Sequence, residues 1–177
     1  MAPTQRLGFI PTFGQAAIHD DQLDHFLNFC VGSPERLAHL NRHAPYPVPD
    51  APAMRAFLRA AGRTYRAWVI ERANDRALVG MVIHGDFVPG CSNSVGVCIG
   101  LDYVRNGYGS EAIQSLCLTL AAEGNPRVMA YCLAGNHPCE RMLLHCGFQR
   151  LGATGRRHAG QDEVRFQFSN GGKGFSA

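Results

Sequence analysis

The pattern of hydrophobic and polar positions predicts a domain in which helices and strands are mixed. Apolar residues recur three and four positions apart, the spacing of a helix buried along one side, in residues 22–30, 33–40, 53–61, 110–122 and 136–146. We expect Asp20 or Asp21 to cap the first of these helices, Ser33 the second and Asn136 the last. Shorter apolar or alternating stretches are typical of strands and cover residues 7–17, 65–71, 78–88, 95–101, 127–133, 148–152 and 163–169. We therefore expect one α/β domain over residues 1–169, and we expect the glycine-rich tail, residues 170–177, to be disordered.

The connecting segments have patterns of their own. Residues 44–52 carry prolines at positions 45, 47, 49 and 52, which exclude regular structure there and predict a rigid connector. Residues 72–76 are polar and join two strand-like stretches, so they predict an antiparallel hairpin. A further polar stretch holds Arg156, Arg157 and His158, and we expect it to be a loop between the last two strands.

The clearest chemical signal lies in residues 94–123. An apolar strand runs into a turn with glycines at positions 107 and 109, and an amphipathic helix follows directly. Glycines allow successive backbone N–H groups to converge on one point, and the helix N-terminus adds about half a positive charge. The turn therefore predicts a binding site for a pyrophosphate that needs no dedicated side chain.

Two other phosphate-binding motifs do not fit this turn. Gly107, Gly109 and Ala112 match the pattern G-x-G-x-x-(G/A) of dinucleotide-binding domains. The acidic residue that should follow about 20 positions later is missing, and the chain beyond the turn is too short for a doubly wound domain. The P-loop pattern G-x-x-x-x-G-K-(S/T) occurs nowhere in the sequence.

A second block, residues 136–148, completes a recognisable pair of motifs. Together the two blocks resemble the GNAT superfamily of acyl-CoA-dependent N-acetyltransferases, most closely the branch of ribosomal-protein serine/alanine N-terminal acetyltransferases. Residues 104–109 match both glycines of the family's loop (Q/R)-x-x-G-x-(G/A), with Val104 in the lead position. The branch's motif N-x-x-S-x-R-x-L-x-x-x-G-F is matched by Asn136, Arg141, Leu143, Gly147 and Phe148, with Cys139 at the Ser position.

The resemblance implies a fold and a cosubstrate. The fold is a mixed, mostly antiparallel central sheet of about six or seven strands flanked by helices, with a splay between the two central parallel strands. Acetyl-CoA would place its pantetheine arm in that splay and its pyrophosphate on the loop. The cofactor-binding residues carried over from the family are Ile99, Leu101, Val104, Arg105, Asn106, Gly107, Tyr108, Gly109, Ser110, Asn136 and Arg141.

Acetyl transfer to an amine needs a neutral amine, a polarised carbonyl group, an acid for the leaving thiolate, and alignment, which can supply roughly 7 to 11 kcal/mol. In the family, a backbone N–H of the central strand, here near residues 98–101, polarises the carbonyl. The acid is commonly a Ser or Tyr hydroxyl. Cys139 stands at the Ser position and is our candidate, with Tyr131 and Tyr108 as alternatives; Cys139 as a buried structural thiol is the competing interpretation.

The general base is less clearly marked. Close relatives often carry a Glu at the start of the central strand, where this chain has Ser94-Val95-Gly96. His84 and Asp86 share one face of the preceding strand and are the remaining candidates. An α-amino group is roughly a fifth neutral near pH 7.4, whereas a lysine is neutral in about one part in a thousand. A site without a strong base therefore favours an amine of low pKa.

Two functions follow from the resemblance. The favoured one is transfer of an acetyl group from acetyl-CoA to a primary amine, on a protein or peptide N-terminus or a small molecule, by direct attack in a ternary complex. The alternative is a CoA-binding protein of the same fold with impaired catalysis, which serves as a sensor or interaction module. The resemblance also leaves a homodimer open.

Composition narrows the range of expected partners and cellular locations. A formal charge of +3 without a basic run of five does not indicate a nucleic acid or membrane partner. Seven cysteines without a C-x-x-C pair favour reduced, buried thiols over disulfides or zinc, so we expect no metal and a cytoplasmic location. No export signal or membrane-spanning stretch is evident in the sequence.

Overall fold

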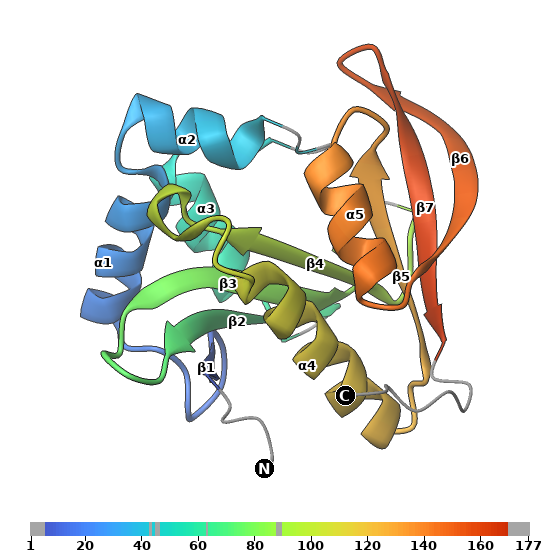
Figure 1. The fold of residues 1–177 in the computed structure, drawn as a ribbon. Coiled ribbons are helices and arrows are strands. Elements are labelled where there is room, and N and C mark those ends of the chain that lie inside the picture. The colour runs from blue at the N-terminus through green and yellow to red at the C-terminus, as the bar shows by residue number, and fades with distance from the viewer. Residues whose placement is uncertain (1–5, 43, 45–46, 63, 88–89, 170–177) are drawn as a thin grey trace.

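The computed structural model describes residues 6–42, 44, 47–62, 64–87 and 90–169 (Figure 1). The tail that we expect to be disordered, residues 170–177, lies outside these ranges. Within them, seven strands form one mixed sheet in the order β1-β2-β3-β4-β5-β7-β6. The strands are β1 (Leu7–Pro11), β2 (Tyr65–Arg72), β3 (Leu78–Gly85), β4 (Ser94–Ile99), β5 (Arg127–Leu133), β6 (Gln149–His158) and β7 (Gln161–Ser169).

Helices cover both faces of this sheet. In the described chain they are α1 (Asp20–Val31), α2 (Pro34–Asn41), α3 (Ala51–Arg59), η1 (Leu101–Tyr103), α4 (Tyr108–Ala122) and α5 (His137–His145). Helices α4 and α5 lie in front of the sheet in Figure 1, and α3 lies behind it. The expected α/β fold with a mostly antiparallel sheet is confirmed, because β4 and β5 form its one parallel pair among the described strands.

The parallel pair at the centre of the sheet is splayed. Strands β4 and β5 share a single bridge, between Ser94 and Met129, with the Met129 amide 2.9 Å from the Asn93 carbonyl oxygen. Beyond that bridge the strands separate, as Figure 1 shows. The expected splay is therefore present, and the backbone of β4 that faces β5 is left without a strand partner beyond Ser94.

Two hydrophobic cores lie on opposite faces of the sheet. Val82 and Val95 belong to the core under α4 and α5. Their neighbours Met81 and Ile83 belong to the core under α1 and α3. This alternation is what a strand buried on both faces requires, and it assigns each residue of the central strands to one side of the sheet.

The helix starts follow from local capping. Ser33 Oγ accepts a hydrogen bond from the Arg36 amide at 3.3 Å, with Pro34 in the first turn, as expected. The connector is shorter than expected, because Asp50 Oδ1 accepts from the Ala53 amide at 2.8 Å and starts α3 at residue 51.

Helix α1 does not use the cap that the sequence suggested. Asp20 and Asp21 lie in its first turn rather than at the cap, which is His19 and makes no side-chain cap bond. Their negative charges still favour this position, because the helix N-terminus carries a partial positive charge.

The prediction of a loop around Arg156, Arg157 and His158 is wrong. These residues form the end of β6, which continues to a tight turn at Ala159 and Gly160, with φ angles of 48° and 79°. Paired positive φ angles are the geometry of a two-residue hairpin turn. The misreading arose because β6 is an edge strand with few apolar residues, so its alternation carries no hydrophobic signal.

Strands β1 and β3 end earlier than the sequence pattern predicts. Strand β1 stops at Pro11, which cannot continue a ladder on its N–H side. Strand β3 stops at Gly85, whose φ of 126° turns the chain away from the sheet. The predicted hairpin between β2 and β3 is confirmed by their antiparallel register, from Tyr65 opposite Gly85 to Ile70 opposite Gly80.

Two features are absent from the described residues: a membrane-spanning helix and a cluster of metal ligands. No helix among them combines the length and apolar character needed to cross a lipid bilayer. Within the same ranges, no group of three or more His, Cys, Asp or Glu side chains is arranged to hold a metal ion.

Candidate functional site

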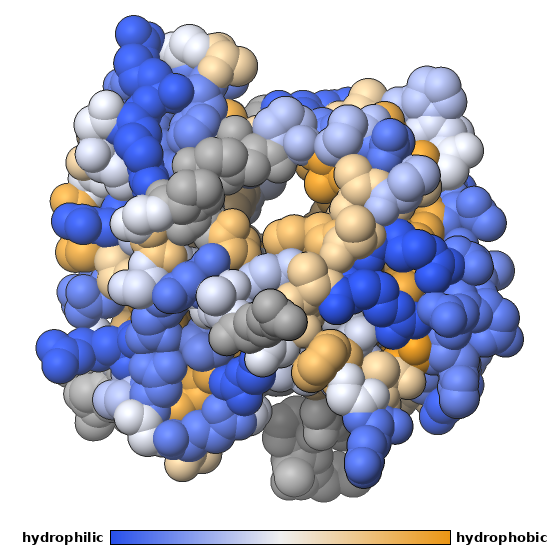
Figure 2. Space-filling view, turned by 180° about the vertical axis from the view of Figure 1, so that it is seen from behind, coloured by the Kyte–Doolittle hydropathy of each residue, from blue (hydrophilic) through white to orange (hydrophobic). Residues whose placement is uncertain are grey.

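A cavity of about 570 Å³ opens where β4 and β5 diverge. Residues of α4 and α5, such as Ile113 and Met142, line one end, and residues of α3, such as Phe57, line the other. Because these helices lie on opposite faces of the sheet, the cavity passes through it. Figure 2 views the molecule from the α3 side and shows this opening, bordered in part by hydrophobic residues. The cavity can therefore receive one molecule from each face.

Small residues of β4 make room for aromatic rings beside the cavity. A Cβ atom on Gly96 would lie 3.0 Å from the Phe87 ring, so the glycine allows Phe87 to pack against the strand. Both residues line the cavity. Gly100, just after β4, allows the ring of Phe29 to approach in the same way.

The turn before α4 presents a row of unpaired backbone amides. Gly107, the N-cap residue of α4, has a φ of 79°, in the left-handed region that side chains disfavour. The first hydrogen bond of the helix runs from the Glu111 amide to the Gly107 carbonyl oxygen, at 3.1 Å. Among the described residues, no hydrogen bond uses the backbone N–H groups of residues 105–110. These groups stand at the positive end of the helix dipole and are available to an anion.

Local hydrogen bonds fix the conformation of this loop. Asn106 Nδ2 donates to the carbonyl oxygens of Tyr103 and Val104, each at 3.1 Å. Arg105, which precedes Asn106, has a φ of 65° and an exposed side chain. Leu101 is partly buried in η1, which leads into the loop. The loop is thus held open by its own residues, with no bond that occupies its amides.

The first turn of α4 packs closely against α5 and β4. A Cβ atom on Gly109 would lie 3.1 Å from Met142 Sδ and 3.7 Å from Ile99 Cγ1. The Cys146 thiol reaches the Ser110 carbonyl oxygen at 3.6 Å. Glycine at position 109 therefore brings the amide row next to the α5 end of the cavity, so that one elongated ligand can contact both.

Tyr108 points away from the cavity. Its ring is buried, with 7% of the residue exposed, and the Arg6 guanidinium lies over it, 5.2 Å from the ring centroid. Its hydroxyl lies 3.2 Å from Arg72 Nη1. Tyr108 does not line the cavity, so this alternative acid lies away from the space where a thioester could sit.

Asn136 lies both at the start of α5 and beside the cavity. Its Oδ1 accepts from the Cys139 amide at 3.2 Å and caps α5, as expected. It also lines the cavity, and no hydrogen bond within the described residues uses its Nδ2. Arg141 lies on α5 with its side chain exposed, away from the cavity lining. The motif residues of the second block are therefore divided between the cavity and the outer surface.

Two thiols meet at the α5 end of the cavity. Cys139 of α5 and Cys132 of β5 both line it, and their side chains are hydrogen-bonded to each other. The contact with Cys139 lowers the pKa of Cys132. The contact with Cys132, together with burial, raises the pKa of Cys139. The two thiols therefore titrate together, and when one of them gives up a proton the other can stabilise the resulting thiolate.

Tyr131 lies on the opposite side of β5, at the α3 end of the cavity. Burial raises the pKa of its hydroxyl, which is hydrogen-bonded to Cys91. The Arg156 guanidinium lies 5.6 Å from the centroid of the ring and 2.5 Å from Oε1 of the fully buried Glu163. Tyr131 is thus a neutral wall residue whose hydroxyl already has a partner.

The two base candidates lie at the closed end of the splay, outside the cavity lining. His84 Nε2 lies 2.7 Å from Asn93 Oδ1, and His84 Nδ1 lies 3.3 Å from Arg66 Nη2. Asp86 Oδ1 accepts from the Asn93 amide at 3.0 Å. Burial lowers the pKa of His84. Both residues support the residue before β4, and their role as a base stays a prediction.

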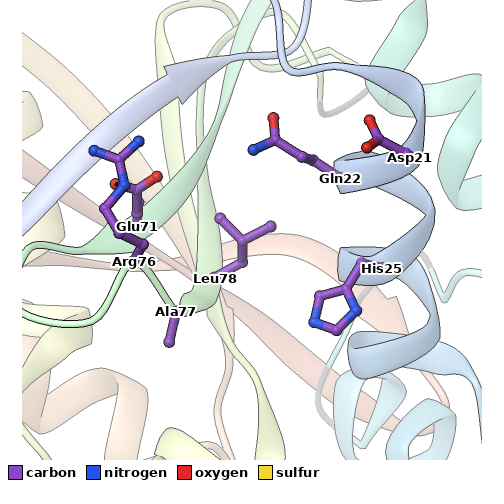
Figure 3. A pocket seen from close by; sticks show the side chains of 7 residues that line it. All are labelled: Asp21, Gln22, His25, Glu71, Arg76, Ala77 and Leu78. Atoms are coloured by element: carbon purple, nitrogen blue, oxygen red, sulfur yellow. Dashed lines mark ion pairs between the residues drawn. The ribbon is translucent and has the colours of Figure 1, made fainter.

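A second cavity, of about 270 Å³, lies between α1 and the β2–β3 hairpin. Figure 3 shows its lining, with Gln22 and His25 on α1 and with Glu71, whose Oε1 lies 2.7 Å from Arg76 Nε. None of the site residues expected from the sequence lies there. Two of its charged groups, Glu71 and Arg76, are paired with each other.

The cavity and the amide row lie within a segment that matches a known family. Residues 16–149 match the family model described as an acetyltransferase (GNAT) domain. The chain belongs to the GNAT acetyltransferase family. The family expected from the sequence is therefore confirmed, and transfer of an acetyl group is the general activity of this GNAT domain.

Solved structures of other acetyltransferases share the fold. A ribosomal-protein-serine acetyltransferase from Vibrio cholerae is 24% identical, with a TM-score of 0.69 over 94% of this chain and 95% of that one. RimL, a ribosomal L7/L12 α-N-protein acetyltransferase in complex with coenzyme A bound to one of its cysteines by a disulfide, is 13% identical, with a TM-score of 0.74 over 94% and 95%.

A third neighbour acts on a different amine. Spermidine N-acetyltransferase from Vibrio cholerae, in complex with CoA and spermine, is 14% identical, with a TM-score of 0.70 over 94% of this chain and 96% of that one. At these identities the likeness shows the fold alone. Among curated protein sequences, none matches the chain.

Cys132 is a cavity residue with candidate chemistry that the sequence analysis did not single out. Its apolar strand predicts a buried thiol, and it is 3% exposed. The available signal was alternation: Ala130 and Cys132 share one face of β5, and Cys139 lies on the inward stripe of the helix that covers this face. Combining the two patterns would have brought the thiols together.

Proposed function

We propose that this GNAT domain transfers an acetyl group from acetyl-CoA to a primary amine by direct attack in a ternary complex. The observation that carries the proposal is the continuity between the unpaired amides of residues 105–110 and the cavity between β4 and β5. The amides suit a pyrophosphate, and the cavity suits the extended arm and thioester that follow it. The family match and neighbours that hold CoA or acetyl-CoA support this assignment.

Alignment is the main contribution of the protein to this reaction. The acyl donor enters from the face of α4 and α5, and the amine enters from the face of α3. The two meet in a cavity that passes through the sheet, so the nitrogen approaches the carbonyl carbon from the side opposite the CoA entry. Holding two reactants in this way can supply roughly 7 to 11 kcal/mol of the barrier.

The edge of β4 that faces β5 supplies the polar groups of the reaction centre. Because β4 and β5 share only the bridge at Ser94, the backbone of β4 beyond it has no strand partner on this side. An N–H group of this edge can donate to the thioester oxygen as negative charge develops there. Nothing in the side chains of β4 is needed for this step.

In the proposed reaction the thiol pair protonates the leaving sulfur. As the amine nitrogen bonds to the carbonyl carbon, the carbon–sulfur bond breaks and the CoA sulfur takes a proton. Cys132 or Cys139 provides that proton, with the other thiol stabilising the resulting thiolate. The proton lost by the nitrogen restores the pair, so the net change moves one proton from nitrogen to sulfur.

The acceptor is an amine that is partly neutral near pH 7. Among the described residues that line the cavity, none is His, Asp, Glu, Lys or Arg, so no strong base faces the reaction centre. An α-amino group, with an unperturbed pKa near 8, meets this requirement better than a lysine. This favours the N-terminal branch of the family as the nearest functional model.

Release of free CoA thiol from acetyl-CoA with a panel of amines tests the proposal, alongside calorimetric titration of acetyl-CoA. We expect binding and amine-dependent thiol release together. Binding with no release for any amine would support the alternative of a CoA-dependent sensor or interaction module. No binding at all would contradict both.

A further inference from the structure

The α3 end of the cavity is lined almost entirely by apolar groups. Helix α3 contributes Ala53, Met54 and Phe57, and Met81, Ile83 and Phe87 come from β3 and the segment after it. All of them except Ala53 belong to or pack against the core under α1 and α3, which places this end of the cavity on the acceptor face. The amine therefore meets a hydrophobic wall.

The polar groups on this wall already have partners. Asn41 Nδ2 donates to the Val48 carbonyl oxygen at 2.6 Å, and Asn41 Oδ1 accepts from the Val48 amide at 2.9 Å. The Tyr131 hydroxyl is hydrogen-bonded to Cys91. Burial raises the pKa of Cys98 to about 12, so its thiol stays neutral. None of these groups offers a charge to a ligand.

We propose that the acceptor is an α-amine whose adjacent side group is apolar and uncharged, and that the α3 end of the cavity selects it. This inference rests on the proposed function, since it concerns the amine of the same reaction. A charged group placed against this wall would lose its water without gaining a partner. An aliphatic or aromatic group would instead bury apolar surface.

The inference separates this chain from a fold neighbour with a polyamine ligand. Spermine carries several positive charges, and the described lining contains no carboxylate to accept them. Similar folds can thus hold different amines, because selectivity depends on the side chains of this wall rather than on the CoA loop.

Phenylalaninamide and argininamide form a matched pair of test substrates. Both present an α-amino group beside a carboxamide, so the nucleophile is nearly the same and only the side group differs. We expect kcat/KM for phenylalaninamide to exceed that for argininamide by at least about tenfold, because the described lining holds no carboxylate to pair with the guanidinium. Equal values, or a preference for argininamide, would overturn the inference and leave the acetyl transfer itself intact.

Ala53→Glu tests the wall directly. Ala53 is the third residue of α3, and its amide bonds to the capping Asp50, a position where Glu is favoured by the helix dipole. The fold should therefore tolerate this change, which adds a carboxylate to the lining. We expect the preference for phenylalaninamide to fall by at least about tenfold, whereas Ala53→Gln, of the same shape without the charge, should keep most of it. An unchanged preference in Ala53→Glu would overturn the assignment of this wall to the acceptor.

Calorimetric binding of the two amides to the CoA-loaded protein distinguishes failure of the proposed reaction from failure of the proposed acceptor class. Preferential binding of phenylalaninamide without turnover would overturn the proposed reaction and keep the acceptor site. Turnover with no preference, in either binding or rate, would keep the reaction and overturn the acceptor class. Neither binding nor turnover with either amide would overturn both.

Discussion

The two ends of the cavity differ in the chemical groups found there, which are backbone amides at one end and side chains at the other. Next to the α4 end lie the unpaired backbone amides of residues 105–110, held by a left-handed glycine and by Asn106. At the α3 end, the wall is made of side chains from α2, α3, β3 and the connector before α3. The first end needs a particular backbone conformation, and the second needs only apolar groups of suitable size.

This difference separates two kinds of function. Every acyl-CoA carries the same pyrophosphate, so a site made of backbone serves all of them and tolerates no side chain in the wrong place. Acceptor amines differ from enzyme to enzyme, and a wall of side chains can change without disturbing the sheet. Substitutions at the α4 end should therefore abolish donor binding, and substitutions at the α3 end should change only the choice of amine.

The largest effect is expected from Gly107→Val. A β-branched side chain cannot adopt the φ of 79° without strain, so the amide row loses its arrangement. Loss of two hydrogen bonds to a charged group, at about 1.5 kcal/mol each, corresponds to a decrease in acetyl-CoA affinity of about a hundredfold or more. Isothermal titration calorimetry measures this directly.

Gly124→Val is the matched control. Gly124 ends the same helix with a φ of 86°, and a Cβ atom there would meet nothing within 4 Å. It carries the same backbone strain at the opposite end of α4. We expect a similar loss of thermal stability with unchanged affinity. Equal affinity losses in the two variants would show that strain alone, and not the amide row, governs binding.

The next effect concerns the thiol pair. Cys139→Ala should lower kcat by up to about a hundredfold, the low end of what one acid supplies, whereas Cys139→Ser should retain most of it. Cys117→Ala removes a buried thiol of α4 that does not line the cavity and should leave kcat unchanged. If Cys139→Ala and Cys139→Ser both turn over at the wild-type rate, Cys139 is a core residue and water protonates the leaving sulfur.

A smaller effect is expected at Asn136. Asn136→Asp keeps an oxygen that can cap α5 and adds a charge that the helix N-terminus favours, but it removes the Nδ2 donor from the cavity. Stability should hold while KM for acetyl-CoA rises by about two- to tenfold, the range of one hydrogen bond. Steady-state kinetics and a melting curve measure the two quantities, and an unchanged KM would leave Asn136 only its capping role.

The smallest effect on turnover is expected at His84. Its pKa is lowered by burial, so the folded state binds the proton less readily than the unfolded chain does. His84 therefore stabilises the protein above its unfolded pKa near 6.5, and this contribution is lost as the pH falls through the lower folded pKa. His84→Gln should reduce the difference in melting temperature between pH 7.5 and pH 5. A large fall in kcat in the same variant would restore His84 as the base.

The sequence predicted most of the fold because local signals and the final packing agree. The helix after Gly107 and the caps at Ser33 and Asn136 follow from periodicity and capping chemistry, and the central parallel pair follows from the family resemblance. The end of β6 was missed because an edge strand with few apolar residues has no hydrophobic alternation to read. The cap of α1 was missed because acidic residues stabilise a first turn as well as a cap.

The sequence predicted the glycine loop of the site better than the side chains that line the cavity. The loop with Gly107 and Gly109 left a motif, because it depends on backbone conformation. The contact between Cys132 and Cys139 and the wall around Phe57 join residues far apart in sequence, and no single stretch contains them. His84 lies on β3, but Asp86 follows the end of that strand at Gly85, so the predicted shared strand face is wrong, and both residues lie at the closed end of the splay.

Treatment with CoA disulfide, followed by peptide mass spectrometry, tests most directly whether the CoA sulfur reaches the α5 end of the cavity. Exchange needs a thiolate and access: one protein sulfur bonds to one CoA sulfur, and the other CoA leaves as a thiol. We predict an adduct confined to Cys132 or Cys139, prevented by excess acetyl-CoA and absent in Gly107→Val. Labelling of Cys30, Cys91 or Cys117 instead, or equal labelling in Gly107→Val, would contradict the account.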